Sequence, residues 1–398
     1  MTEKMMTKKL AALFAVTSGL AVGNLYWAQP LLAAITETFG VATSSGGLLI
    51  TATQIGYAIG ILLILPLGDI LRRRKLIFIL ILCSVAALAC CAAAPSFTML
   101  GAALAVLGLV TISGQIVLPL TGDLSAPEER GHLVGIVSSG ILTGILLSRF
   151  ISGIVAAFGG WRMIYVLAAV LNLIMAIIVY RNIPDIEPKT KTSYKDLLKG
   201  VFTAFARYRV LPLILLETGM IFGITFNLFW TGMTFLLSDA PFHYNTFQIG
   251  LLSLVGLAGA AGGMGIGKLQ DKGLGIPALG IFIALDGLCM LSGVFFGRSI
   301  VAIAIIGAVF SPVTQGVSVL CQARLFNLSN TERSRLNTVF VVNNFVFCAI
   351  GSTLAAVLWN VGGWTAISIG GASAALIALI VWVIARKPFR AMDAQIEE

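Results

Sequence analysis

The chain has 398 residues, of which 58% are hydrophobic and only 11% are charged, and its mean hydropathy is +0.99. A soluble protein of this length needs far more polar surface, so the composition excludes a water-soluble fold. The formal net charge of +9 could suit nucleic acid, but the placement of the charges described below argues against that partner.

Apolar stretches near or above the about 20 residues that cross a bilayer follow one another along the whole chain. We predict an all-α membrane protein with twelve transmembrane helices, because the sequence lacks the alternation of barrel strands. The predicted spans are residues 10–35, 46–71, 75–94, 98–121, 131–157, 161–181, 208–237, 246–268, 276–297, 299–323, 334–360 and 363–385.

The basic residues mark one side of this twelve-span arrangement. Of the 26 Lys and Arg residues, only Arg149, Arg162 and Arg298 fall on the other side. Such an excess of Lys and Arg is typical of cytoplasmic loops. The sequence therefore predicts a multi-pass protein of the bacterial inner (cytoplasmic) membrane, with both termini in the cytoplasm.

The second half of the chain repeats the first at one constant offset. The matching segments are NLYW at 24–27 with NLFW at 227–230, GLL at 47–49 with GLL at 250–252, ER at 129–130 with ER at 332–333, and GGW at 159–161 with GGW at 362–364. We expect two six-helix pseudo-repeats, an organisation common in transporters, with the substrate site between the halves.

This repeat sets the expected domain boundaries. They are an N-terminal six-helix bundle (1–181), a cytoplasmic linker (182–207), a C-terminal six-helix bundle (208–386) and a cytoplasmic tail (387–398). Helix-like spacing of apolar residues in the linker predicts a short surface helix there. The short charged tail is expected to be disordered.

Aromatic and amide side chains gather in the first and seventh predicted spans. Such groups suit amphipathic organic molecules, although an aromatic belt at the membrane surface would look similar in sequence. Uncharged amides inside spans also need partners in lipid. The candidate substrate residues of this kind are Asn24, Tyr26, Trp27, Gln29, Gln115, Asn227 and Trp230.

The loop after the second span places an acid at a helix end, directly before a basic cluster. Asp69, Arg73 and Arg74 carry this pattern, and the second half has Asp271 and Lys272. With the twelve spans and the half-repeats, the loop resembles the signature of the major facilitator superfamily. Leu65 and Arg72 replace glycines of that signature, and Ile70 replaces its first base.

The resemblance implies that both loops act as gates that latch the cytoplasmic side. A carboxylate at one helix end can face the positive N-terminus of another helix. The expected partner is the helix start near Ser334 for Asp69, and the one near Gly131 for Asp271. The alternative is ordinary cytoplasmic positive charge without a gating role.

Small residues four apart line the fifth span, at Gly140, Gly144, Ser148 and Ser152, and predict the close approach of another helix. Residues 126–162 and 24–32 resemble the bacterial drug- and sugar-efflux branch of the superfamily, which includes drug:proton antiporters. The antiporters carry a proline in their glycine-rich motif that this chain lacks.

Three charged residues lie well inside predicted spans, away from the span ends, where they are costly and often functional: Arg149, Glu217 and Asp286. Arg149 could hold an anionic substrate group or pair with a proton-carrying acid, or it could reach the outer headgroups. A buried carboxyl group can carry protons near neutral pH. Alternatively, Glu217 pairs with an Arg of the adjoining loop, and Asp286 bonds a neighbouring helix. Asp123 is expected to be a cap or loop partner.

These features predict a secondary active transporter that exports small organic compounds, drug- or sugar-like, by proton-coupled alternating access. The alternative is an uncoupled facilitator or importer, and a membrane sensor or enzyme is less favoured, because the sequence has no catalytic triad, P-loop or HExxH motif. We expect no cofactor and no metal, with a proton gradient as energy source. The expected partners are the lipid bilayer and a small-molecule substrate, and we expect a monomer. The six cysteines are expected to pack without disulfides.

Overall fold

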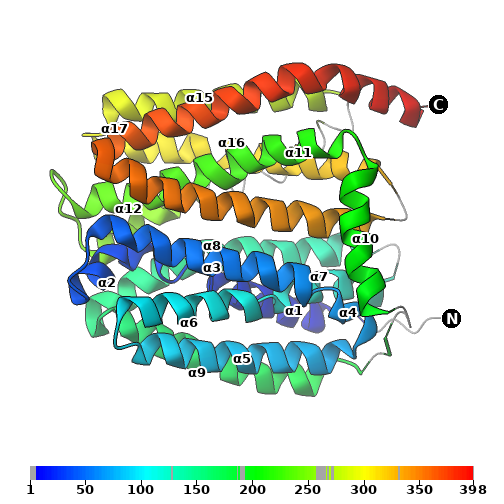
Figure 1. Cartoon of the computed structure of the whole chain (residues 1–398). Coiled ribbons are helices and arrows are strands. Elements are labelled where there is room, and N and C mark those ends of the chain that lie inside the picture. Colours follow the sequence, from blue (N-terminus) through cyan, green and yellow to red (C-terminus); the bar gives the residue numbers. More distant parts are fainter. Residues whose placement is uncertain are drawn as a thin grey trace. The chain divides into compact units, whose positions relative to one another are not determined.

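The computed structural model describes residues 6–126, 129–185, 187–188, 193–256, 266, 269, 273–329 and 332–397, with side chains up to residue 389. Every regular element within these ranges is helical (Figure 1). Nine helices in the described part are long and apolar enough to cross a membrane. One of these stretches, Arg333–Phe389, has 57 residues and contains two of the predicted spans. The prediction of an all-α membrane protein is confirmed.

The first six predicted spans and the linker form these elements: α1 (Lys8–Gly23), η1 (Gln29–Leu31), α2 (Leu32–Thr38), η2 (Thr43–Ser45), α3 (Gly46–Leu63), α4 (Leu67–Ile70), α5 (Arg73–Ala93), α6 (Phe97–Val110), α7 (Ser113–Leu124), α8 (Arg130–Gly159), α9 (Trp161–Asn182) and α10 (Tyr194–Arg207). The first span is therefore broken after Gly23, just before the NLYW segment. Pro30 follows in η1, where it lacks the N–H that a continuing helix would use.

The remaining spans form α11 (Leu211–Thr218), the π-helix η3 (Gly219–Thr225), α12 (Phe226–Ser238), α13 (Thr246–Leu252), η4 (Ser253–Gly256), α15 (Gly275–Phe296), α16 (Ile300–Asn327) and α17 (Arg333–Glu397). The tail predicted as disordered continues α17 to Glu397, which corrects that expectation. Its residues Ala391, Met392 and Ala394 are good helix formers, so the backbone can continue without a break.

The repeated GGW segments mark sharp turns between consecutive spans. Gly160 has φ 73° between α8 and α9, and Gly363 has φ 58° where α17 breaks. A side chain at either position would be strained, since only glycine adopts positive φ readily. The repeat therefore preserves a backbone requirement at both places.

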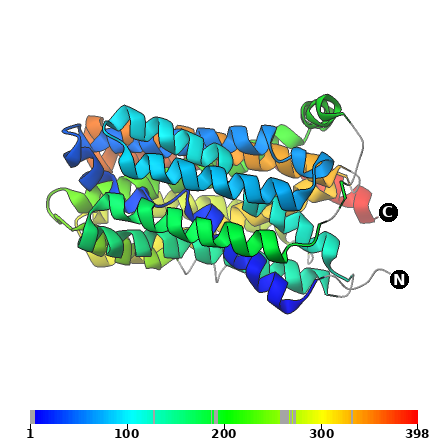
Figure 2. The ribbon, with the colours of Figure 1, turned by 90° about the horizontal axis from the view of Figure 1, so that it is seen from below.

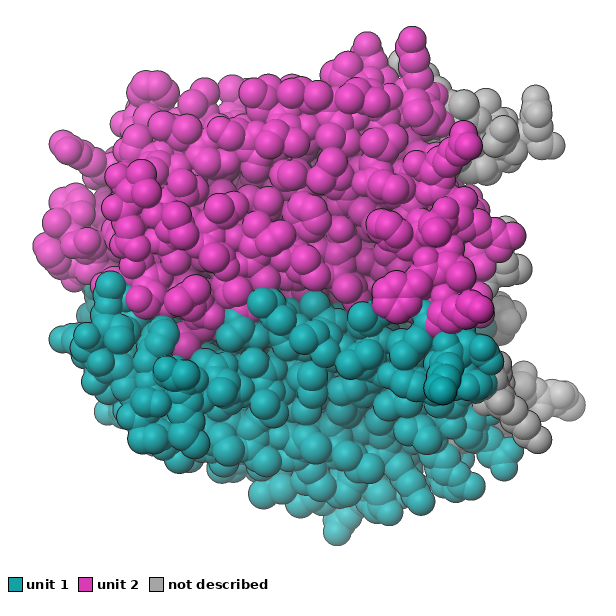
Figure 3. Space-filling view, in the orientation of Figure 1, with its two compact units in different colours: residues 1–42, 52–198, 244–254 teal, residues 43–51, 199–243, 255–398 magenta. Residues whose placement is uncertain are grey.

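The chain folds as two compact units, drawn in teal and magenta in Figure 3. Unit 1 holds residues 1–42, 52–198 and 244–254, and unit 2 holds residues 43–51, 199–243 and 255–398. Within unit 1, α5 and α9 lie side by side, as Figures 1 and 2 both show. The boundary between the long segments of the two units falls inside α10, the helix predicted in the linker.

The repeated GLL segments pack against repeat-equivalent partners. In unit 2, a Cβ on Gly47 would lie 2.8 Å from the Ser352 carbonyl oxygen. In unit 1, a Cβ on Gly250 would lie 3.1 Å from both the Arg149 carbonyl oxygen and the Gly153 Cα. Arg149 and Ser352 are equivalent positions of the repeat, so the same close backbone packing occurs once in each unit.

The small-residue stripe of α8 receives α1, as predicted. A Cβ on Gly19 would lie 2.6 Å from the Gly140 carbonyl oxygen, and Gly144 faces Gly19 at even closer range. At the end of the stripe, the Ser152 hydroxyl donates to the Trp27 carbonyl oxygen at 2.6 Å. Backbones that approach this closely gain van der Waals contact that larger side chains would prevent.

Candidate functional site

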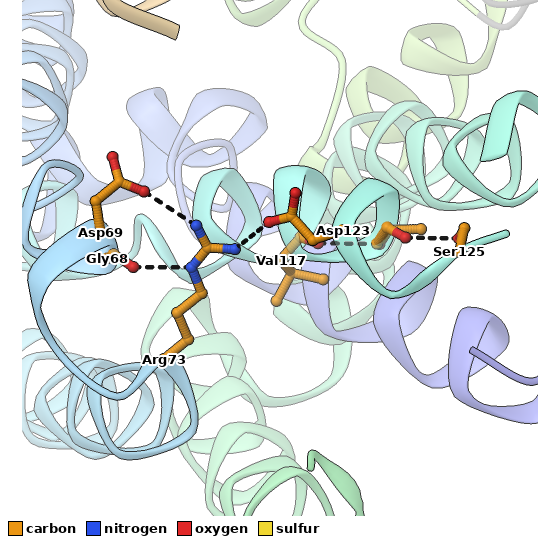
Figure 4. Close-up of polar contacts among 7 residues, drawn as sticks. Gly68, Asp69, Arg73, Val117, Asp123 and Ser125 are labelled. Atoms are coloured by element: carbon orange, nitrogen blue, oxygen red, sulfur yellow. Dashed lines mark hydrogen bonds and ion pairs between the residues drawn. The ribbon is translucent and has the colours of Figure 1, made fainter. Parts of the chain in front are cut away.

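The acid-base loop of unit 1 centres on Arg73, a buried residue at the start of α5 (Figure 4). Its Nη2 contacts Asp69 Oδ1 at 3.0 Å, and its Nη1 contacts Asp123 Oδ2 at 2.6 Å. Its Nε donates to the Gly68 carbonyl oxygen at 2.8 Å. One planar guanidinium thus holds two carboxylates from different helices. Asp123 is a loop partner, as predicted.

The neighbouring arginines point elsewhere. Arg72 contacts Asp185 at 2.6 Å on the exposed surface, and the Arg74 guanidinium carbon lies 4.5 Å from the Tyr180 ring centroid. The predicted contact of Asp69 with the helix start near Ser334 would join the two units and stays a prediction.

The second candidate loop, at Asp271 and Lys272, lies outside the described residues. Its predicted gating role and its predicted contact near Gly131 therefore stay predictions as well.

The NLYW segment of unit 1 forms a buried hydrogen-bond network. Asn24 accepts from Trp27 Nε1 at 2.9 Å and from Asn172 Nδ2 at 3.4 Å, and it donates to Thr111 Oγ1 at 3.0 Å. These bonds tie the end of α1 to the end of α6 and to α9. Asn24 and Trp27 therefore act together in fixing the break in the first span.

Arg149 lies in α8 and is only 1% exposed. Its guanidinium carbon stacks 4.8 Å from the Tyr26 ring centroid, a cation–π distance. This burial does not match an Arg that reaches lipid headgroups. The structure thus brings together two predicted site residues, Arg149 of α8 and Tyr26 of the turn between α1 and η1.

The two predicted glutamines have different surroundings. Gln29 is buried, and its Oε1 accepts no hydrogen bond from any described residue. Gln115 donates from Nε2 to the Tyr57 hydroxyl at 3.1 Å. Gln29 therefore keeps an acceptor to offer, whereas Gln115 already has a partner inside unit 1.

The NLFW segment of unit 2 follows the π-helix η3 directly. Asn227 donates from Nδ2 to the Gly223 carbonyl oxygen of that π-helix at 3.0 Å. The Trp230 ring lies 5.5 Å from the Phe229 ring in an edge-to-face contact. Trp230 and Trp27 are both buried, which does not match rings of an interfacial belt.

Glu217 lies in α11 and is 0% exposed. The Cys321 thiol is 3.9 Å from Glu217 Oε2, and the charge of Arg324 acts on the carboxylate. Glu217 Oε1 has no hydrogen-bond partner among the described residues. The buried carboxyl group therefore has a thiol and a nearby guanidinium as its polar surroundings.

Sequence reasoning missed Arg324, because the predicted span ends at residue 323. The helix α16 continues to Asn327, and Arg324 is 0% exposed, with its guanidinium carbon 4.4 Å from the Phe389 ring centroid. The signal was its spacing: Cys321 and Arg324 are three residues apart and so share one helix face. The Arg that acts on Glu217 belongs to α16, not to an adjoining loop.

Asp286 lies in α15 and is also 0% exposed. Thr225 Oγ1, in the π-helix, is 3.2 Å from Asp286 Oδ1 and 2.6 Å from the Ile221 carbonyl oxygen. The hydroxyl has one hydrogen, so it can donate to only one of these two acceptors. Asp286 therefore contacts a neighbouring helix, as predicted, through a hydroxyl that has a second acceptor nearby, and Asp286 Oδ2 has no partner in the described part of the chain.

The cysteines are free, as predicted, although Cys321 contacts a carboxylate besides packing. No group of His, Cys, Asp or Glu residues suited to a metal ion occurs within the described ranges.

Apolar spanning helices, two repeat-related units and charges buried inside the spans define a multi-pass membrane transporter. The chain belongs to the Major Facilitator Superfamily, whose sequence model matches residues 13–327. It is 36% identical over 374 residues to the "Uncharacterized transporter YgaY" of Escherichia coli O157:H7, covering 94% of each chain. It is 27% identical over 253 residues to the "Inner membrane transport protein YnfM" of Escherichia coli strain K12, covering 61% of this chain and 59% of that one.

Solved transporter structures share this fold, with which the predicted twelve spans are consistent. A bacterial homologue of the human lysosomal transporter Spinster, inward-facing and occupied, superposes with a TM-score of 0.75 at 13% identity. The match covers 97% of this chain and 96% of that chain. At this identity the likeness concerns the fold alone.

Proposed function

We propose that the chain is a proton-coupled exporter of small organic compounds, drug- or sugar-like, that works by alternating access. One observation carries the proposal: Glu217 and Asp286 are fully buried carboxyl groups inside spans of unit 2. Each has one oxygen without a hydrogen-bond partner among the described residues. A buried charge of this kind is retained where it does work, and moving protons is such work.

Protonation would bias the transport cycle through electrostatics. The neutral acid is easier to bury than the carboxylate, so loss of the proton changes the free energy of every conformation that keeps the group from water. Arg324 can balance the Glu217 charge, whereas the polar contact of Asp286 among the described residues is the uncharged Thr225 hydroxyl. A ligand shifts a conformational equilibrium only if it binds one conformation more tightly than the other. A proton at Glu217 or Asp286 would do so, because it binds more tightly in the conformation that buries the carboxyl group.

The substrate groups are proposed on both units. In unit 1, the Arg149 guanidinium over Tyr26 could hold an anionic or aromatic group, and Gln29 offers an acceptor. In unit 2, Asn227 and Trp230 follow the π-helix, an irregularity frequent at functional sites. The loops around Asp69 and Asp271 are proposed as the cytoplasmic gate.

The setting is proposed from charge placement. Basic residues predict both termini in the cytoplasm, and the name of the relative YnfM supports an inner-membrane location. We propose a monomer that uses the proton gradient and no cofactor.

An uncoupled facilitator or importer is the second candidate. Two observations favour it: Asp286 already contacts the Thr225 hydroxyl of a neighbouring helix, and the glycine-rich fifth span lacks the proline of the antiporters. In that case both carboxyl groups would be structural, and transport would follow the substrate gradient alone.

Transport into proteoliposomes distinguishes the two. The purified chain would be tested with labelled organic cations, organic anions and monosaccharides, with and without a pH gradient. We expect at least one class to move faster with the gradient, and Glu217→Gln to abolish that acceleration. Transport that ignores the gradient in both proteins would favour the facilitator, and retained acceleration in Glu217→Gln would exclude that residue as a proton carrier.

A further inference from the structure

A cavity of about 730 Å³ lies in unit 1 where α1 and α5 begin and α9 ends. Three basic side chains line it: Lys9 of α1, Arg74 of α5 and Arg181 of α9. Its other walls include the aliphatic residues Leu10, Leu13 and Ile178. The cavity therefore combines a cationic mouth with an apolar wall at the ends of three helices, two of them long enough to span the membrane.

The described residues do not balance the charge of this cavity. None of the described residues that line it is acidic, and Lys9, Arg74 and Arg181 form no ion pair with any described residue. The next arginines along α5 differ, since Arg72 contacts Asp185 and Arg73 contacts two aspartates. The imbalance is thus local to the cavity.

Arg74 is held in place and keeps donors to spare. Its guanidinium stacks on Tyr180, which itself packs 4.7 Å from the Phe78 ring. Its Nε is buried and has no hydrogen-bond partner among the described residues. A buried donor of this kind costs free energy unless an acceptor meets it, so an anion near the Arg74 guanidinium would be stabilising.

The start of α1 adds to the attraction for an anion. Thr7 lines the cavity and caps α1, accepting from the Leu10 N–H at 3.2 Å. The remaining N–H groups of the first turn give this helix end a partial positive charge. Three cations and a helix N-terminus therefore converge on one space.

We propose that this cavity binds the phosphate headgroup of an anionic phospholipid, with an acyl chain along α9. Phosphate oxygens would accept from Lys9, Arg74 and Arg181, as basic pockets between spanning helices do for lipid headgroups. A lipid fits better than free phosphate, because Ile178 leads from the cavity to exposed apolar residues of the same helix, Ile177 and Ile174. The proposal rests on membership of a membrane family and not on the transported substrate.

Native mass spectrometry of the full chain in detergent tests it. Phosphatidylglycerol and phosphatidylcholine would be added in turn, and the bound lipids counted. We expect wild type to prefer phosphatidylglycerol. Binding of this lipid should be roughly 100-fold weaker, at about tenfold or less per cation, in the triple variant Lys9→Gln, Arg74→Gln, Arg181→Gln. The single variant Arg181→Gln, at an exposed site, should fold even if the triple variant does not and should lose roughly fivefold.

A matched control removes the same charge outside the cavity. Lys75, Lys195 and Lys199 are exposed and do not line it, so Lys75→Gln, Lys195→Gln, Lys199→Gln should retain wild-type lipid binding. Equal losses in both triple variants, or no loss in Arg181→Gln, would overturn the proposal. Inorganic phosphate should not displace phosphatidylglycerol at equal concentration, and efficient displacement would assign the cavity to a free anion instead.

Discussion

The helix pairs α1/α8 in unit 1 and η3/α17 in unit 2 hold equivalent places in the repeat but pack differently. In unit 1, glycines of both helices meet, with Gly19 against Gly140 and Gly144. In unit 2, Phe347 stands at the position equivalent to Gly144, and a Cβ on Gly219 would lie 2.7 Å from its ring. The fold therefore needs a small surface at each crossing, and the π-helix of unit 2 makes room for a large ring.

The buried charges differ between the units in the same way. Unit 1 buries Arg149, and the equivalent position in unit 2 is the buried Ser352. Unit 2 buries Glu217 and Asp286, whose equivalents in unit 1 are Phe14 and Cys83. Because one unit folds without each charge, the scaffold does not require it. The repeat preserves packing and turns, and the departures from it carry the chemistry.

The largest effect is expected at the glycine crossing of unit 1. In Gly144→Val the new side chain would overlap the backbone at Gly19, and overpacking of this severity should destabilise the unit by about 3 kcal/mol or more. Size-exclusion chromatography of detergent extracts should show little folded protein. The control is Gly135→Val on the same helix, where no atom lies within 4 Å of an added Cβ. An equal loss of folded protein in Gly135→Val would show that the close packing at Gly144 is not the cause.

The carboxyl groups of unit 2 should give the next largest effect. Glu217→Gln and Asp286→Asn keep the shape of each side chain but remove proton exchange, so acceleration of transport by a pH gradient should fall at least tenfold. Asp69→Asn, in unit 1, changes a proposed gate residue and should lower rates with and without the gradient alike. A selective loss of gradient response in Asp69→Asn would contradict the assignment of proton chemistry to unit 2.

A smaller effect is expected at the acid-base loop. Arg73→Gln leaves Asp69 and Asp123 without their shared cation and should lower the free energy of unfolding by about 1–2 kcal/mol. Arg72→Gln removes an exposed pair and should change it by less than about 0.5 kcal/mol. Thermal unfolding in detergent measures the stability of both variants. Equal decreases in the unfolding temperature would show that the buried Arg73 contributes no more to stability than the exposed Arg72.

The smallest effect separates the two repeat asparagines. Asn24→Ala removes three side-chain hydrogen bonds and should cost about 1 kcal/mol. Asn227→Ala removes a bond to the preceding helical turn and a contact with the Cys348 thiol, and should cost less than Asn24→Ala. If Asn227→Ala were more destabilising than Asn24→Ala, then the NLYW segment would not be the one of the two repeated segments that stabilises the fold more.

The sequence predicted the features that depend on residue type and period. Hydropathy located the spans, the linker helix α10 followed from the spacing of Leu197, Leu198 and Val201, and the stripe of α8 predicted a close neighbour. Contacts were harder, because the direction of a side chain depends on the rotation of each helix about its axis. Asp69 therefore turned out to be held by Arg73, four residues away.

Two features of the candidate site were not predicted from the sequence. The π-helix of residues 219–225 has an ordinary apolar sequence, and it packs against α17. Arg324 was predicted to be a cytoplasmic charge, because a span predicted from hydropathy stops at the first cation. Hydropathy cannot show that the helix continues past that residue, as α16 does. Its guanidinium stacks on Phe389, which lies far along the chain.

The central claim is that Glu217 and Asp286 exchange protons while buried in unit 2. Infrared difference spectroscopy of the chain in lipid, recorded across a pH titration, tests this claim without a known substrate. We predict carboxyl C=O bands whose intensity changes with pH, one lost in Glu217→Gln and another in Asp286→Asn, with both retained in Asp123→Asn. Variant spectra that match wild type throughout the titration would contradict the account.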